Sequence, residues 1–266
     1  MSRLQNVFAQ LQGKRAALVT FVTGGDPEPA LTVPLLHALV EAGADVLEVG
    51  IPFSDPMADG PVIQMSHQRA LAHGTTMGDV LAMVASFRQQ DTRTPVVLMG
   101  YVNPVEAMGY AVFARACADA GVDGVILVDL PPEEATEWLA AARRAGVDRV
   151  FLLAPTSPPE RITRVGEASS GFVYYVALKG VTGAAHLDIA DVAKKLAVVR
   201  SHLRLPVGVG FGVQDAASAR ALGEVADAVI VGSALIRRLV APEGKDAIAG
   251  ARSFVAGLRA ALPPRQ

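Results

Sequence analysis

The phrase AGVDGVILV, residues Ala120–Val128, has close variants elsewhere in the chain. Gly121 suits the left-handed position that commonly lies just past the end of a helix. The apolar run after Asp123 is typical of a short strand that is buried on both faces of a parallel sheet. The phrase therefore predicts a junction between a helix and a buried strand.

The same pattern occurs at three other places, with the glycine present in all but the last: Ala42–Val49, Ala145–Leu153 and Glu224–Val231. Four more apolar runs lie between these junctions: Ala17–Thr23, Pro95–Met99, Phe172–Leu178 and Pro206–Gly210. Together the two sets predict eight strands.

Alanine-rich amphipathic segments separate the strands and predict helices over Leu31–Glu41, Met77–Arg88, Val105–Asp119, Glu133–Arg144, Asp191–Ser201 and Asp215–Leu222. Strands that alternate with helices indicate βα units and a parallel sheet. Eight such units in about 250 residues favour a closed (β/α)₈ (TIM) barrel. An open doubly wound sheet is the alternative that the same alternation permits.

No linker rich in Pro, Gly or Ser divides the chain, so we expect residues 1–266 to form one barrel domain. Leu4, Val7, Phe8 and Leu11 recur at helical spacing and predict an extra helix before the first strand. A long loop, Ile51–Thr75, follows the second strand, and we expect extra short helices after strands 2 and 8. Long loops after barrel strands lie at the catalytic face.

The composition excludes several classes of protein. Of 266 residues, 51% are hydrophobic and 19% charged, which is too apolar for a disordered chain. A net charge of −2 gives no electrostatic footprint for nucleic acid or an anionic membrane. One cysteine, Cys117, excludes an internal disulfide and a cysteine-cluster metal site. Because no signal peptide or membrane-spanning run is found, we expect a cytoplasmic protein.

Glu48 lies inside the apolar run of the second strand, on the same face as Val46 and Gly50. If this face points into the barrel, burial would raise the pKa of the carboxyl toward neutrality, as a general acid/base requires. The alternative is a structural Glu that is paired with an Arg or a backbone amide. Asp55 and Asp59 follow in the next loop, where Asp59 could instead cap a helix that begins near Val62.

Glycine clusters follow three successive strands, at Gly180–Gly183, Gly208–Gly212 and Gly232–Ala234. Glycines let backbone N–H groups approach an anion, and phosphate sites in these barrels are often built after strands 7 and 8. We therefore expect a phosphate site here, although tight turns are the alternative. The histidines form no ligand pair at helical spacing, and no metal site is predicted.

Lys179 ends the sixth strand, and a desolvated lysine there could form a Schiff base. Beside a phosphate site, it suggests an aldolase or a sugar-phosphate isomerase as an alternative function. A solvated loop lysine is the simpler interpretation.

Several of these motifs together resemble the tryptophan synthase alpha subunit family. They are FVTGGDP (Phe21–Pro27), LEVGIPFSDPMADGP (Leu47–Pro61), GVTG (Gly180–Gly183), GFG (Gly210–Gly212) and GSA (Gly232–Ala234). The resemblance runs from Met1 to about Leu239. It implies a barrel that cleaves indole-3-glycerol phosphate into indole and glyceraldehyde 3-phosphate. It also implies no cofactor in this chain, and a pyridoxal-phosphate-dependent beta subunit as partner in an α₂β₂ complex that passes indole through a tunnel.

The resemblance assigns roles to particular residues. Glu48 and Asp59 match the catalytic carboxylates. The indole would lie among Phe21, Tyr174, Thr182 and Phe211, and the phosphate on Gly183, Gly212, Gly232 and Ser233. Lys179 has no catalytic counterpart in the family, which weakens the Schiff-base alternative. A third hypothesis is that the chain serves mainly as an allosteric activator of its partner.

Overall fold

The computed structural model describes residues 1–177, 188–210, 212–240 and 246–264. In these ranges nine parallel strands form one sheet, in the order β5-β4-β3-β2-β1-β9-β8-β7-β6. The strands are β1 Ala17–Thr23, β2 Val46–Gly50, β3 Val96–Gly100, β4 Gly124–Leu127, β5 Asp148–Arg149, β6 Leu152–Leu153, β7 Val173–Val176, β8 Val207–Gly210 and β9 Ala228–Val231.

The two short strands β5 and β6 occupy one position of the barrel. They belong to a single run, 148–153, in which β5 pairs with β4 and β6 pairs with β7. Between them, the Val150 N–H donates to the Val125 carbonyl at 3.0 Å, and the Tyr174 N–H donates to the Phe151 carbonyl at 3.0 Å. The run thus joins the two ends of the sheet, and the predicted eight-position (β/α)₈ barrel is confirmed.

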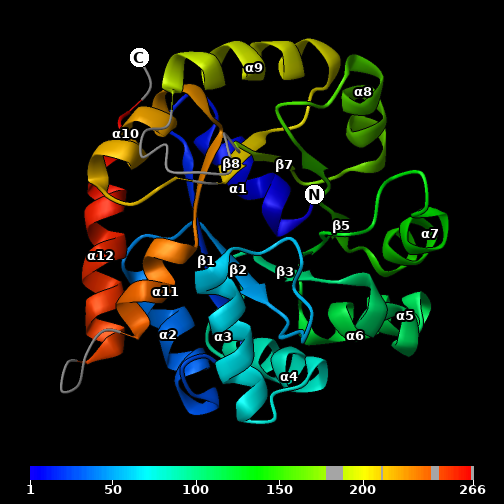
Figure 1. Ribbon diagram of the computed structural model, residues 1–266, viewed down its shortest axis with the longest axis vertical. Coiled ribbons are helices and arrows are strands. Elements are labelled where there is room, and N and C mark those ends of the chain that lie inside the picture. Colours follow the sequence, from blue (N-terminus) through cyan, green and yellow to red (C-terminus); the bar gives the residue numbers. More distant parts are fainter. Residues whose placement is uncertain (178–187, 211, 241–245, 265–266) are drawn as a thin grey trace.

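Helices surround the strands (Figure 1). They are α1 Arg3–Leu11, α2 Pro29–Glu41, α3 Pro61–Ala72, α4 Met77–Arg88, α5 Val102–Met108, α6 Tyr110–Ala120, α7 Thr136–Ala145, α8 Pro159–Ala168, α9 Ile189–His202, α10 Ala216–Val225, α11 Ser233–Leu239 and α12 Ala247–Ala261. The predicted extra helices are α1, before β1, and α3 and α11, after β2 and β9. The prediction of one continuous helix over 105–119 was wrong, because Gly109, at φ 89°, separates α5 from α6.

Helix α1 closes the amino-terminal end of the barrel and lies across the middle of the ring in Figure 1. A capping box between Ser2 and Gln5 begins it. Its buried side chains, Leu4 and Phe8, pack with the inward-facing residues of the strands, and the Phe8 ring lies 5.5 Å from that of Phe172. A second, larger apolar layer fills the space between the strands and the outer helices and includes the buried Cys117.

The aspartates of the repeated phrase stand at the starts of the strands. The carboxylates of Asp45, Asp123 and Asp227 each accept a backbone N–H from the preceding position of the sheet, at 2.8, 2.8 and 3.0 Å. Each also pairs with an arginine: Arg15 at 2.6 Å, Arg88 at 2.7 Å and Arg200 at 3.1 Å. The repetition in the sequence therefore serves the architecture of the amino-terminal end.

None of the helices in the described residues is both long and apolar enough to cross a membrane.

Candidate active site

A cavity of about 590 Å³ opens at the carboxyl ends of the strands. Its wall includes most of the residues that the sequence singled out and that the structure describes: Phe21, Glu48, Asp59, Met99, Ile126, Leu152, Tyr174, Gly212, Gly232 and Ser233. They come from nearly every barrel strand or the loop after it. The closed sheet therefore gathers into one wall residues as far apart in the chain as Phe21 and Ser233.

Glu48 projects into this cavity from β2, as strand alternation predicted. The residue is only 1% exposed, and its Oε2 atom has no hydrogen-bond partner among the described residues. Burial, and secondarily the negative charge of Asp59, raise the pKa of Glu48 to about 8. The structural alternative of an arginine or amide partner is not found in the described part of the chain. The site therefore holds a carboxyl that can release and recover a proton near neutral pH.

Asp59 lies in the loop after β2, at the rim of the same cavity. The hydroxyl of Tyr101 donates to its Oδ2 at 2.8 Å, and Nε2 of His67 lies 3.2 Å from that oxygen. The alternative that Asp59 caps α3 was wrong, because Gly60 is the N-cap and no side chain caps the helix. Asp55 does not line the cavity; its carboxylate accepts a hydrogen bond from Ser54 at the exposed surface.

Two aromatic rings occupy positions that glycines keep open. A Cβ on Gly50 would lie 2.9 Å from the ring of Phe21, and one on Gly210 would overlap the hydroxyl of Tyr174. Both rings line the cavity, as expected for the walls of an apolar pocket. Gly50 and Gly210 therefore leave space for the side chains of Phe21 and Tyr174. Thr182 and Phe211, which were also assigned to the substrate, lie outside the described residues.

The expected phosphate end of the cavity contains Gly212, Gly232 and Ser233. Gly212 has φ 81°, in the left-handed region that favours glycine. Gly232 precedes α11, so the N–H groups of Ser233 and Ala234 belong to the first turn, where a helix offers them no internal acceptor. Gly183, the fourth predicted phosphate contact, and Lys179 both lie outside the described residues.

Two residues that contact Asp59, His67 and Tyr101, are not among the site residues that the sequence predicts. Tyr101 directly follows β3 and so stands at a strand end, which is a signal that could have identified it. The sequence spacing of His67 indicates no metal-ligand pair and no other role. Its position on the buried face of α3 gave no indication of its neighbour in the preceding loop.

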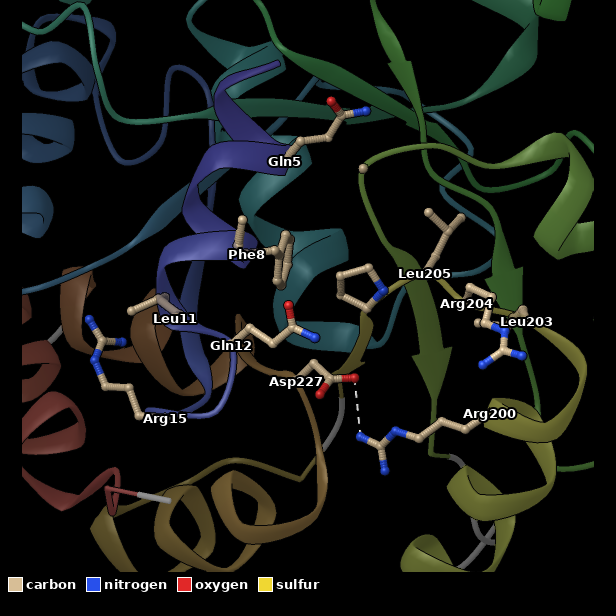
Figure 2. Close-up of a pocket in the computed structure, with 13 residues that line it drawn as sticks. Gln5, Phe8, Leu11, Gln12, Arg15, Arg200, Leu203, Arg204, Leu205 and Asp227 are labelled. Carbon is tan, nitrogen blue, oxygen red and sulfur yellow. Dashed lines mark hydrogen bonds and ion pairs between the residues drawn. The ribbon is translucent and has the colours of Figure 1, made fainter. Parts of the chain in front are cut away.

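A second cavity, of about 430 Å³, lies at the opposite, amino-terminal end of the barrel. Figure 2 shows Phe8 of α1 and Arg200 of α9 on its wall, with Asp227 paired to that arginine. Arg15, also on the wall, forms two contacts with Asp45, at 2.6 and 2.7 Å. This cavity contains no carboxyl comparable to Glu48. Among the described residues, no group of His, Cys, Asp and Glu could hold a metal ion.

Comparison with known proteins matches residues 8–260 to the model of a family described as "Tryptophan synthase alpha chain". The chain belongs to the tryptophan synthase alpha chain family. An alpha chain of Burkholderia thailandensis is 58% identical over 263 residues, which cover 98% of this chain and 97% of the relative. That of Cupriavidus pinatubonensis is 56% identical over 264 residues, covering 98% and 99%.

Solved structures agree. The alpha subunit from Legionella pneumophila superposes with a TM-score of 0.91 at 42% identity, covering 98% of each chain. A tryptophan synthase structure from M. tuberculosis, in its aminoacrylate-bound form, superposes with a TM-score of 0.87 at 39% identity, covering 98% of this chain and 100% of that one. The expectation of a carbon–carbon lyase of tryptophan biosynthesis that cleaves indole-3-glycerol phosphate is confirmed, and the aldolase, isomerase and activator alternatives are not favoured. Membership of an alpha-chain family also implies a complex with a beta subunit.

Proposed function

We propose that Glu48 is the proton-transferring residue of the cleavage and that Asp59 stabilises the charge that develops on the indole ring. The observation that carries this proposal is Glu48 itself. It is a buried carboxyl on the cavity wall, with a pKa of about 8 and an Oε2 atom that accepts no hydrogen bond from the described residues. Such a group is costly to the fold, and it is suited to exchange a proton with a bound substrate.

The chemistry needs two proton transfers at neighbouring atoms. Protonated Glu48 gives its proton to C3 of the indole, which places positive charge on the ring. The resulting carboxylate then takes the proton of the adjacent side-chain hydroxyl. The C3–carbon bond breaks, its electron pair returns to the ring, and indole and glyceraldehyde 3-phosphate are released. Glu48 ends protonated, as it began, so one carboxyl on a rigid strand serves both steps.

Asp59 has a different part in the same reaction. As the ring becomes positive, its N–H becomes a stronger donor, and a fixed carboxylate facing it lowers the energy of that state. Oδ2 of Asp59 is contacted by Tyr101 and His67. In the described part of the chain Oδ1 accepts no hydrogen bond, so we assign Oδ1 to the indole N–H.

The remaining cavity residues bind the two ends of the substrate. Phe21 and Tyr174 would contact the indole, with Thr182 and Phe211 beside them. Backbone N–H groups of Gly212, Gly232 and Ser233, together with Gly183, would hold the phosphate, because amides at a helix start attract an anion without a basic side chain.

The chain needs no cofactor of its own in this scheme, since proton transfer and charge stabilisation are supplied by carboxylates. We assign pyridoxal phosphate to the beta subunit, the assembly to an α₂β₂ complex, and the fate of indole to direct passage into that subunit. We also propose the cytoplasm as the compartment of this reaction.

The test measures indole release from indole-3-glycerol phosphate by the purified chain and by Glu48→Gln and Asp59→Asn variants. We expect each variant to lose about 10³-fold in kcat, within the range that removal of general acid–base or electrostatic catalysis produces. Both substitutions preserve shape, so circular dichroism should show folded proteins. Near-wild-type turnover in either variant would refute the role of that residue.

A further inference from the structure

His67 is a buried histidine, only 2% exposed, on the inner face of α3. The helix is fixed on either side of it. The hydroxyls of Ser66 and Thr23 lie 2.6 Å apart, and Arg69 forms two contacts with Asp26, at 2.6 and 2.9 Å. The contacts of Ser66 and Arg69 therefore fix α3 to the end of β1 and to the residues that follow it. The His67 ring is held in place beside the loop after β2.

One ring nitrogen of His67 forms a hydrogen bond with the protein backbone. Its Nδ1 accepts the backbone N–H of Phe53 at 3.1 Å. A backbone amide can only donate, so Nδ1 must carry a lone pair, and in the neutral ring the proton resides on Nε2. The fold thereby selects one tautomer of His67 and presents an N–H at the far side of the ring.

That N–H faces Asp59. The distance from Nε2 to Oδ2 of Asp59 is 3.2 Å, off the line of a full hydrogen bond, and Nε2 has no other partner among the described residues. The Tyr101 hydroxyl donates to the same oxygen at 2.8 Å and accepts the N–H of Ala58 at 3.1 Å. Oδ2 of Asp59 thus lies close to two buried donor groups, whereas Oδ1 accepts no hydrogen bond from the described residues.

The contacts form a closed circuit. The ring of Phe53 stacks on that of Tyr101, with centroids 5.1 Å apart and planes inclined by 26°. Phe53, His67, Asp59 and Tyr101 therefore touch in sequence and return to the start. The circuit ties the beginning and the end of the loop to α3 and to the end of β3, so movement of Asp59 would disturb every member.

We infer that His67 is a positioning residue, which holds Oδ2 of Asp59 through its Nε2–H and so keeps Oδ1 directed at the indole nitrogen. The inference rests on the proposed role of Asp59. An N–H donor bound at Oδ1 turns the carboxylate, and a slight turn brings Oδ2 into line with Nε2. The contact is then strongest when charge on the indole is greatest, so its loss lowers kcat more than it raises KM.

Two substitutions separate the two faces of the ring. In His67→Asn the side-chain oxygen can still accept the Phe53 N–H, but no donor reaches Asp59. In His67→Gln the longer amide can place an N–H near Asp59, but the bond to Phe53 is lost. We expect kcat to fall about 10- to 100-fold in His67→Asn, as for other outer partners of catalytic groups, with KM unchanged within about threefold. His67→Gln should retain kcat within about threefold of wild type, because the donor to Asp59 is preserved.

The outcomes are distinct. Equal losses in both variants, or none in His67→Asn, would overturn the inference. Adding His67→Asn to Asp59→Asn should cause no further loss, because the histidine acts through the aspartate. If Asp59→Asn alone leaves kcat intact, the proposed role of Asp59 fails instead. Nitrogen NMR of ¹⁵N-histidine-labelled wild-type protein needs no variant: it should show His67 as the neutral Nε2–H tautomer, and an Nδ1–H tautomer would contradict the proposal.

Discussion

Three aspartates at the amino-terminal end of the barrel and Glu48 at the carboxyl-terminal end have opposite surroundings. At the amino-terminal end, Asp45, Asp123 and Asp227 each hold a backbone N–H and an arginine. At the carboxyl-terminal end, Glu48 is almost fully buried, and its Oε2 atom has no partner in the described residues. Both ends have a cavity, of about 430 and 590 Å³ respectively.

The difference suggests that acidic residues at the amino-terminal end stabilise the fold, whereas Glu48 at the carboxyl-terminal end is available for proton transfer. A carboxylate that already binds an arginine and an amide has fewer acceptor sites left for a ligand. Burial raises the pKa of a carboxyl that lacks a hydrogen-bond partner, so that it can exchange a proton near neutral pH. This burial costs folding free energy when the carboxyl is ionised. The paired aspartates are expected to support the fold that carries this cost.

The largest expected effect on stability is at Asp123, which accepts the Val96 N–H and pairs with Arg88 at 2.7 Å and Arg3 at 2.9 Å. Asp123→Ala leaves the buried Arg88 without its carboxylate and the Val96 N–H without its acceptor, so we expect a loss of about 3–5 kcal/mol in the free energy of unfolding. Urea denaturation measures it. Turnover per folded molecule should change by less than about twofold. A large loss of kcat in the folded variant would contradict the view that the amino-terminal end serves stability and not catalysis.

An effect of similar size, but dependent on pH, is expected at Glu48. Its pKa is raised from 4.5 to about 8 in the folded protein, so between these values the folded chain holds a proton that the unfolded chain releases. The stability that this proton confers is complete below pH 4.5 and is lost as pH rises through about 8. Relative to Glu48→Gln, which cannot ionise, the wild type should lose about 1.4 kcal/mol per pH unit within this window.

Urea denaturation of both proteins at several pH values between 5 and 8 measures this difference. The glutamine variant serves as its own control, since all other ionisable groups are shared. If the two stabilities run parallel across the window, Glu48 ionises in the folded protein as it does in water, and the contrast between the two ends of the barrel disappears.

The smallest effect is expected at Arg200, whose side chain is 40% exposed where it pairs with Asp227 in the amino-terminal pocket. Exposed ion pairs contribute little, so Arg200→Ala should cost less than about 1 kcal/mol in unfolding free energy. Indole release should be unaffected. A loss of turnover comparable to that of an active-site variant would mean that this pocket takes part in the function.

Much of the fold could be read from local patterns. The repeated helix-to-strand phrase and the spacing of the apolar runs predicted the eight barrel positions, and strand alternation placed Glu48 on the inner face. These signals are local, because a glycine at a helix end and alternation along a strand depend on neighbours in the chain. The break at Gly109 was missed, since the flanking segments have similar helical character.

The tertiary structure decided what the inner residues experience. The pKa of Glu48 depends on burial by a closed barrel, and the circuit around Asp59 joins β3 and α3 to a loop of β2, through a hydrogen bond that spans 42 positions from Tyr101. No local pattern encodes such contacts. By itself, then, the sequence determined the barrel and the family, and it predicted the two candidate carboxylates. Only the packing of distant segments decided that Asp59 is contacted by Tyr101 and His67, and that Oε2 of Glu48 lacks a hydrogen-bond partner among the described residues. The physical reason is that solvation and pairing are properties of the assembled chain.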